Sequence, residues 1–111
     1  MGEKQGQGGR SEVYFSSITV SKPEADSSLP GKFSRLLKKF DLERLCQGAR
    51  VPIKMHLGGG MGYTTIHPIF VRVLVQAVKD AGGKPFAVEG SFHAVEEAAA
   101  RGYTAETLGC P

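Results

Sequence analysis

The sequence predicts an α/β fold with a small, mainly parallel three-stranded sheet and helices packed on it. Three observations lead to this prediction. Segments rich in β-branched and aromatic residues alternate with segments whose apolar residues recur at helical spacing. Short connections follow the second and third predicted strands. Because strand–helix–strand units favour parallel pairing, right-handed crossovers are expected, while the sequence leaves the order of the strands open.

The chain begins with a polar, glycine-rich stretch, residues 1–11, which we expect to be a flexible tail. It offers almost no apolar surface to offset the entropy of ordering. Residues 12–20, EVYFSSITV, are rich in β-branched and aromatic side chains and are predicted to form the first strand. A turn-forming loop, SKPEADSSLPG, follows it. Residues 12–111 are therefore predicted to be a single α/β domain.

A one-sided helix is predicted from Lys32 onward, because apolar residues recur at helical spacing with basic residues on the other side. The apolar residues are Phe33, Leu36, Leu37 and Phe40. Asp41 is a candidate cap for a short further turn, LERLC, which Gly48 ends.

The middle of the chain predicts a strand and a long helix. The segment 51–56 is short and mostly apolar, as a strand inside a parallel sheet should be. Pro68 suits the first turn of the next helix, and Gly82 and Gly83 close it. The polar residues of this helix fall on one narrow stripe, so most of its circumference is expected to be buried.

The last segment predicts a third strand and two short helices. Residues 84–89, KPFAVE, are predicted to form the strand. Ser91 is expected to cap a helix that Gly102 stops, and Thr104 to begin another.

Composition limits the classes of protein to consider. The chain has 111 residues, of which 41% are hydrophobic and 23% charged, as in one small globular domain. The net charge of +3 is mild, and aromatic residues are not interleaved with basic ones, so nucleic-acid binding is not expected. No stretch of about twenty apolar residues could span a membrane, and the N-terminus has no signal-like apolar core. A cytoplasmic, prokaryotic protein with Cys46 and Cys110 as free thiols is expected.

Polar residues gather where the second and third predicted strands end, which is where open parallel sheets bind ligands. Lys54 and His56 share one face of their strand, because side chains alternate along it. A lysine inside a buried strand is costly unless paired, and Glu89 is the expected partner. Two roles for Lys54 stay open, namely a structural ion pair and contact with a ligand.

The loop GGGMGYTT, residues 58–65, is compatible with anion binding, because glycines let backbone N–H groups approach an anion near a helix N-terminus. It matches neither the GxxxxGK[ST] nor the GxGxxG pattern, so a plain turn is the alternative. The candidate ligand-binding residues are Lys54, His56, Gly58, Gly60, Gly62, Thr64 and Thr65.

Histidines near the same edge suggest a metal site, because imidazole with carboxylate suits zinc, iron or nickel. The candidate metal ligands are His56, His67, His93 and Glu89. No HxH or HExxH spacing supports them, and a histidine at a helix start can simply cap the helix.

Several of these motifs resemble a known family, domain of unknown function number 362, often labelled as uncharacterised iron–sulfur-centre proteins. The matching residues are Ile53, Lys54 and His56, then Thr64, Thr65 and Pro68, then Gly82, Gly83 and Pro85, and finally Glu89. In the tail they are Ala98, Gly102, Tyr103, Ala105, Leu108 and Gly109. The resemblance spans about residues 12–111. Two positions depart from the family pattern, since Gly59 stands where many members have glutamate and Glu89 where aspartate is more common.

The resemblance implies a redox- or metal-associated domain, of which this chain would be the N-terminal part. A part of a larger sheet would expose a strand edge or helix face, so self-association is expected. Some family members append a segment with clustered cysteines. Two distant cysteines cannot supply the four thiolates of a four-iron cluster, so no iron–sulfur cluster is expected within this chain, and other cofactors are unknown.

Three functions remain open at this stage. The first is an enzyme or redox-associated domain with its site at the carboxyl edge of the sheet. The second is a binding module that holds an anionic small molecule or nucleotide without chemistry. The third is a scaffold for a partner protein, in which the glycine loop is only a turn.

Overall fold

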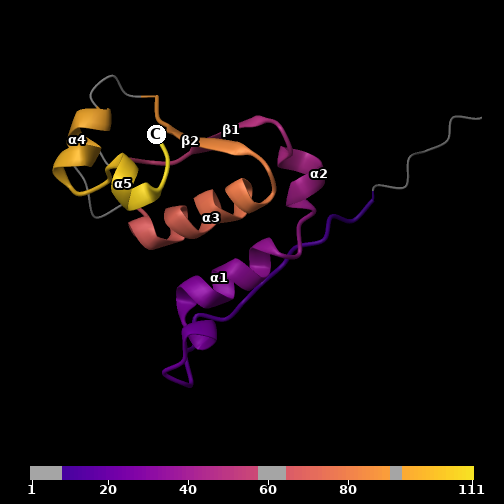
Figure 1. The fold of residues 1–111 in the computed structure, drawn as a ribbon. Helices are drawn as coiled ribbons and strands as arrows, with labels where there is room; N and C mark the ends of the chain where they lie inside the picture. Colours follow the sequence, from indigo (N-terminus) through magenta and orange to yellow (C-terminus); the bar gives the residue numbers. More distant parts are fainter. Residues whose placement is uncertain (1–8, 58–64, 91–93) are drawn as a thin grey trace, which may run out of the picture.

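The computed structural model of the chain describes residues 9–57, 65–90 and 94–111 (Figure 1). Residues 1–8 of the predicted tail lie outside this part. So do several residues predicted for caps and ligands, namely Gly58, Gly60, Gly62, Thr64, Ser91 and His93. The elements, in chain order, are the 3-10 turn η1 (Ala25–Ser27), α1 (Leu29–Leu37), α2 (Leu42–Cys46), β1 (Arg50–Lys54), α3 (Pro68–Asp80), β2 (Lys84–Val88), α4 (Ala94–Ala100) and α5 (Ala105–Leu108).

The two strands β1 and β2 pair in parallel, with Arg50 opposite Lys84 and Lys54 opposite Val88. This confirms the α/β class and the parallel pairing of the second and third predicted strands. Side chains alternate along β1 and its extension, so that Ile53, Met55 and Leu57 are buried while Lys54 and His56 are exposed.

The prediction of a first strand over residues 12–20 is wrong, and the described part of the chain holds two strands rather than three. This segment instead runs beside α1, where the Lys32 ammonium donates to the Ser17 carbonyl at 2.8 Å and also to that of Thr19. Its large apolar residues face solvent, with Phe15 and Ile18 86% and 82% exposed. The segment therefore has strand-like composition without a partner strand.

Both strands carry a proline whose nitrogen lies on the outer side of the sheet. The Met55 N–H donates to the Val88 carbonyl, which turns the odd residues of β1 toward β2 and leaves Pro52 facing outward. The nitrogen of Pro85 points away from β1 in the same way, although the Pro85 residue is buried. Proline has no N–H to give a further strand and is confined to such edges. Composition alone predicted the strand at 12–20, but neither outer edge of the described sheet offers it a full set of donors. On the outer side of β2, the Ala87 N–H already donates to the Pro111 carbonyl at 2.8 Å.

The two N-terminal helices are confirmed, although α1 both starts and ends earlier than predicted, since Phe40 lies beyond its last residue, Leu37. Helix α1 starts at Leu29, earlier than predicted, because Ser28 caps it by accepting the Gly31 N–H at 3.2 Å. Asp41 caps α2 by accepting the Arg44 N–H at 3.1 Å.

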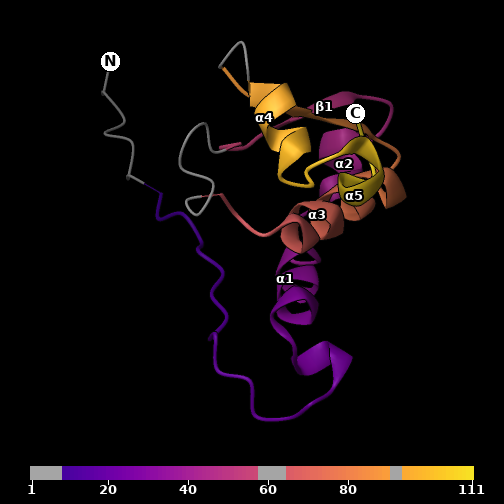
Figure 2. The same cartoon turned by 90° about the vertical axis from the view of Figure 1, so that its left-hand side faces the viewer.

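Helix α3 lies between α1 and the sheet, which occupy opposite sides of it in both views (Figures 1 and 2). Its predicted position is confirmed. Val71, Val75 and Val78 are buried, and Phe70, Val73, Leu74 and Ala77 are half-buried. The exposed residues are the predicted polar stripe, namely Arg72, Gln76, Lys79 and Asp80, together with Ile69, which is 37% exposed.

The main core forms where β1, α3 and the two last helices meet. Its buried members are Ile53, Met55, Leu57, Val71, Val75, Ala98, Leu108 and Cys110. Cys46 is buried separately at the end of α2, and both cysteines are free thiols.

Glycine ends α3 and brings it close to α2. Gly82 has a φ of +83° and donates to the Lys79 carbonyl, while Gly83 donates to that of Val78, which is the Schellman arrangement. A Cβ atom at Gly83 would lie 2.8 Å from Val78 Cγ1 and 3.1 Å from Cys46 Cβ. The glycine therefore permits the tight entry into β2.

The last two helices form as predicted within the described residues. Gly102, with a φ of +88°, follows α4, and Thr104 caps α5 by accepting the Thr107 N–H at 3.3 Å. None of the described helices has the length and apolar character needed to cross a membrane.

Candidate functional site

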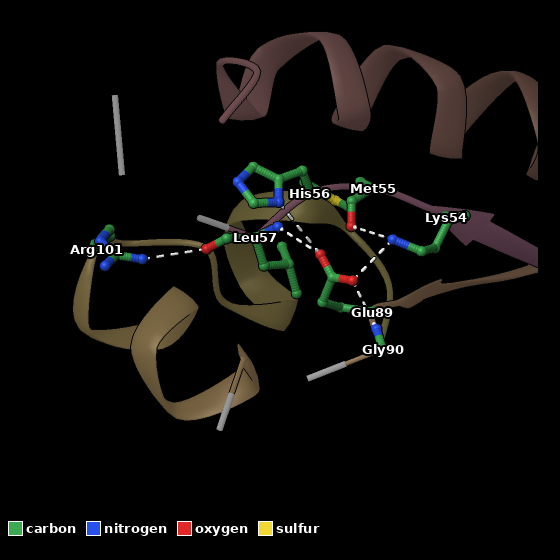
Figure 3. A network of polar contacts seen from close by, with 7 residues as sticks. All are labelled: Lys54, Met55, His56, Leu57, Glu89, Gly90 and Arg101. Atoms are coloured by element: carbon green, nitrogen blue, oxygen red, sulfur yellow. Dashed lines mark hydrogen bonds and ion pairs between the residues drawn. The ribbon is translucent and has the colours of Figure 1, made fainter. Parts of the chain in front are cut away.

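Glu89, the residue after β2, is the centre of a polar network at the carboxyl edge of the sheet (Figure 3). Its Oε1 accepts the Lys54 ammonium at 2.8 Å and the Gly90 N–H at 2.6 Å. Its Oε2 accepts the Leu57 N–H at 3.1 Å. The Glu89 side chain is only 14% exposed. The predicted pairing of Lys54 with Glu89 is therefore confirmed.

These donors keep the carboxylate ionised. The Lys54 ammonium, followed by the backbone N–H groups of Gly90 and Leu57, lowers the pKa of Glu89 to about 2. Hydrogen bonds to the charged form outweigh the effect of burial, which acts in the opposite direction. Glu89 is accordingly an anion at neutral pH, and its charge is matched by fixed donors.

The Glu89 carboxylate also ends the sheet. The Met55 N–H makes the last ladder bond, to the Val88 carbonyl at 3.2 Å. In a continuing parallel ladder the Leu57 N–H would reach the backbone of residue 90, but here it donates to the Glu89 side chain. The two chain segments can therefore separate without leaving that N–H unpaired. Such separation at the carboxyl ends of parallel strands produces the crevice in which ligands bind.

Lys54 and His56 project from the solvent-facing side of the β1 segment and flank Glu89 (Figure 3). Their side chains are 65% and 58% exposed. The expectation that Lys54 lies in a buried strand is wrong, because no described helix covers this face of the sheet. His56 Nδ1 lies 3.7 Å from Glu89 Oε2. The edge thus presents an exposed ammonium and an exposed imidazole around one half-buried carboxylate.

The other predicted site residues in the described part lie at the start of α3. His67 caps this helix, since its Nδ1 accepts the Ile69 N–H at 3.2 Å. Thr65 has a buried hydroxyl oxygen with no hydrogen-bond partner among the described residues. The remaining candidates, Gly58, Gly60, Gly62, Thr64 and His93, lie outside the described residues.

The predicted metal set is only partly brought together. His56 and Glu89 are neighbours, whereas His67 uses Nδ1 for its cap. Within residues 9–57, 65–90 and 94–111, no three His, Cys, Asp or Glu side chains are close enough to hold a metal ion. The set that includes His93 stays a prediction.

Sequence reasoning missed the groups that hold Leu57. Its N–H binds Glu89, and its carbonyl accepts Arg101 NH1 at 3.1 Å. A backbone amide carries no sequence signal, and Arg101 belongs to a distant helix end with no local pattern. Both backbone polar groups of Leu57, the residue directly after His56, are therefore hydrogen-bonded.

Comparison with known proteins adds one finding. Residues 51–111, from β1 to the last residue, match the family model described as Domain of unknown function (DUF362). No curated protein and no solved structure matches the chain.

Proposed function

Because this chain belongs to the family described as Domain of unknown function (DUF362), a description that specifies no activity, we propose a function from the site itself. The carboxyl edge of the β1–β2 sheet binds a small anionic molecule, with Lys54 and His56 as its contacts. The observation that carries this proposal is an ammonium held at 2.8 Å by a carboxylate that is 14% exposed, while the lysine side chain itself remains 65% exposed.

The charges support an anionic ligand. The Glu89 carboxylate forms an ion pair with Lys54 and accepts two backbone N–H groups, so its acceptor capacity is largely used inside the protein. The Lys54 ammonium donates to Glu89 Oε1 at 2.8 Å and to the Met55 carbonyl at 3.5 Å, which leaves one N–H donor that can turn to solvent. A phosphate or carboxylate group would receive a charge-assisted hydrogen bond from this ammonium and a further contact from the His56 imidazole.

The start of α3 supports the same ligand class. The positive end of a thirteen-residue helix favours an anion, and Thr65, just before it, has a buried hydroxyl oxygen that finds no partner among the described residues. Residues Gly58, Gly60, Gly62 and Thr64 remain proposed contacts in this scheme. They belong to the sequence that joins β1 to α3.

Titration with inorganic phosphate tests the proposal. We expect saturable shifts of the Leu57 and Gly90 amide signals in nuclear magnetic resonance spectra, with a Kd on the order of 1 mM. Ionic strength must be held constant with chloride, because general screening of surface charge would otherwise imitate binding.

Lys54→Met should weaken phosphate binding by about tenfold or more, because one charge-assisted hydrogen bond is lost. Lys54→Arg, which keeps the charge, should restore most of it. The matched control is Lys84→Met, since Lys84 lies on the same face of the sheet at its amino end and changes the net charge equally. Absence of saturable shifts, or equal weakening by both methionine variants, would overturn the proposal.

A metal-associated role is the second proposal, favoured by the His56 Nδ1 to Glu89 Oε2 distance of 3.7 Å. These two groups would supply part of a zinc, iron or nickel site, with His93 as the proposed further ligand. An iron–sulfur cluster does not fit, because the chain has two cysteines and a four-iron cluster takes four thiolates. Zinc titration followed by calorimetry should show binding that His56→Gln abolishes and that His67→Gln leaves unchanged.

A further inference from the structure

The turn after α4, residues 101–103, donates hydrogen bonds to both ends of the connection between β1 and α3. We call this turn the corner. At the β1 end, the Leu57 carbonyl accepts Arg101 NH1 at 3.1 Å. At the α3 end, the Ile66 carbonyl accepts the Tyr103 hydroxyl at 3.0 Å. The two donors are separated in sequence only by Gly102, so both ends are tied to a single turn.

Backbone hydrogen bonds to α4 hold the conformation of the corner. The Gly102 N–H donates to the Ala99 carbonyl and the Tyr103 N–H to that of Ala98, each near 3 Å, which is the Schellman arrangement. Gly102 takes the left-handed conformation that the arrangement requires, with a φ of +88°. Thr104 then begins α5 at once.

The corner is also fixed to the core. The Tyr103 ring packs against the core cluster, of which Leu57 and Ala98 are buried members. The hydroxyl that reaches Ile66 is therefore presented by a ring whose position packing determines. Removing the hydroxyl alone would leave that packing in place.

We propose that Arg101 and Tyr103 are positioning residues, which fix the spacing between the end of β1 and the start of α3 and thereby set the affinity of the carboxyl edge for its anion. This inference rests on the proposed function. Lys54 and His56 project from the β1 segment, and Thr65 precedes the start of α3, so in this proposal the anion contacts both ends of the connection. An anion held between them loses contacts on one side if the spacing drifts.

Phosphate titration of Tyr103→Phe and Arg101→Gln tests this role. Each variant should bind phosphate roughly fivefold more weakly, because each loses one hydrogen bond and the net contribution of an ordinary hydrogen bond corresponds to about this factor. The measurement is made well below the melting temperature of every variant, so a purely structural role would leave the affinity unchanged. Arg101→Lys should recover part of the loss. The matched controls are Tyr14→Phe, which removes an exposed hydroxyl bonded to Glu12, and Arg44→Gln, which breaks an exposed ion pair with Asp41.

Amide hydrogen exchange without ligand separates the two proposals. Arg101→Gln should speed exchange at Leu57, and Tyr103→Phe should speed it at the first amides of α3. If the wild type binds phosphate and both variants bind equally well, the positioning role is overturned while the proposed function stands. If the wild type does not bind phosphate, the proposed function fails and the role in affinity fails with it. Unchanged exchange in both variants would also overturn the positioning role.

Discussion

The Glu89 carboxylate accepts the backbone N–H of Leu57 at 3.1 Å, so the side chain that follows β2 takes the place of a backbone partner for the segment that follows β1. The same carboxylate orients Lys54, which makes the end of the sheet and the candidate site one structural unit. Changes at Glu89 should therefore affect both stability and ligand binding.

The pH dependence of stability should report on Glu89. Its pKa falls from the usual 4.5 to about 2 on folding, so the ionised group stabilises the fold above about pH 4.5. That contribution is lost as the pH falls from about 4.5 toward 2. Urea unfolding across this range should show a smaller pH dependence for Glu89→Gln than for the wild type. Glu24→Gln is the control, since Glu24 makes no side-chain cap bond, and an identical decline in Glu89→Gln and the wild type would refute the assignment.

Truncation of Val75 should test the main core. Val75 is 1% exposed, and Val75→Ala removes buried apolar groups and leaves a cavity, so we expect a loss of about 2 kcal/mol in the free energy of unfolding. Val95→Ala makes the same chemical change at a residue that is 72% exposed and should have almost no effect. Similar losses for both variants, measured by urea unfolding, would contradict the described packing.

Gly83→Ala should destabilise the junction of α2, α3 and β2. The added Cβ would stand 2.8 Å from Val78 Cγ1, and overpacking of this kind costs about 1–3 kcal/mol. Thermal unfolding followed by circular dichroism measures the effect. Gly90→Ala serves as the control, since a Cβ there meets nothing within 4 Å. A melting temperature of Gly83→Ala equal to that of the wild type would show that the junction is looser than described.

Self-association stays a prediction, and the segment 12–20 is its proposed surface. Phe15 and Ile18 expose most of their side chains, and burying them against a second copy would be favourable. Size-exclusion chromatography with light scattering should give a mass above 11.9 kDa for the wild type. The double variant Phe15→Ser and Ile18→Ser should return it to a monomer, whereas Val95→Ser should not. A monomeric wild type would exclude the prediction.

The unit from β1 through α3 to β2 could be predicted from sequence because its signals are local. Pro68 and Gly82 mark the ends of α3, and alternation along residues 53–57 assigns the two faces of β1. The prediction of a first strand is wrong because strand formation also depends on a partner that lies elsewhere in the fold. Residues 12–20 have strand-like composition, but whether they form a strand depends on an edge with donors, and Pro52 removes one.

The candidate site likewise contains contacts that the sequence predicts and contacts that only the tertiary structure brings about. Lys54 and Glu89 could be paired in advance, because each ends a predicted strand and parallel strands end at one edge. The Leu57 amide, by contrast, joins the network only once the register is fixed. Arg101 reaches Leu57 across the fold, so its role follows from the tertiary structure alone.

The prolines whose nitrogens lie on the outer sides of β1 and β2 also affect how this protein would form fibrils. Amyloid requires each chain to bond continuously with those above and below, and a proline in every layer interrupts that stacking. Pro52 and Pro85 therefore make β1 and β2 poor fibril cores. Residues 12–20, which lack proline and stand exposed, are the segment from which cross-β growth would start during prolonged storage.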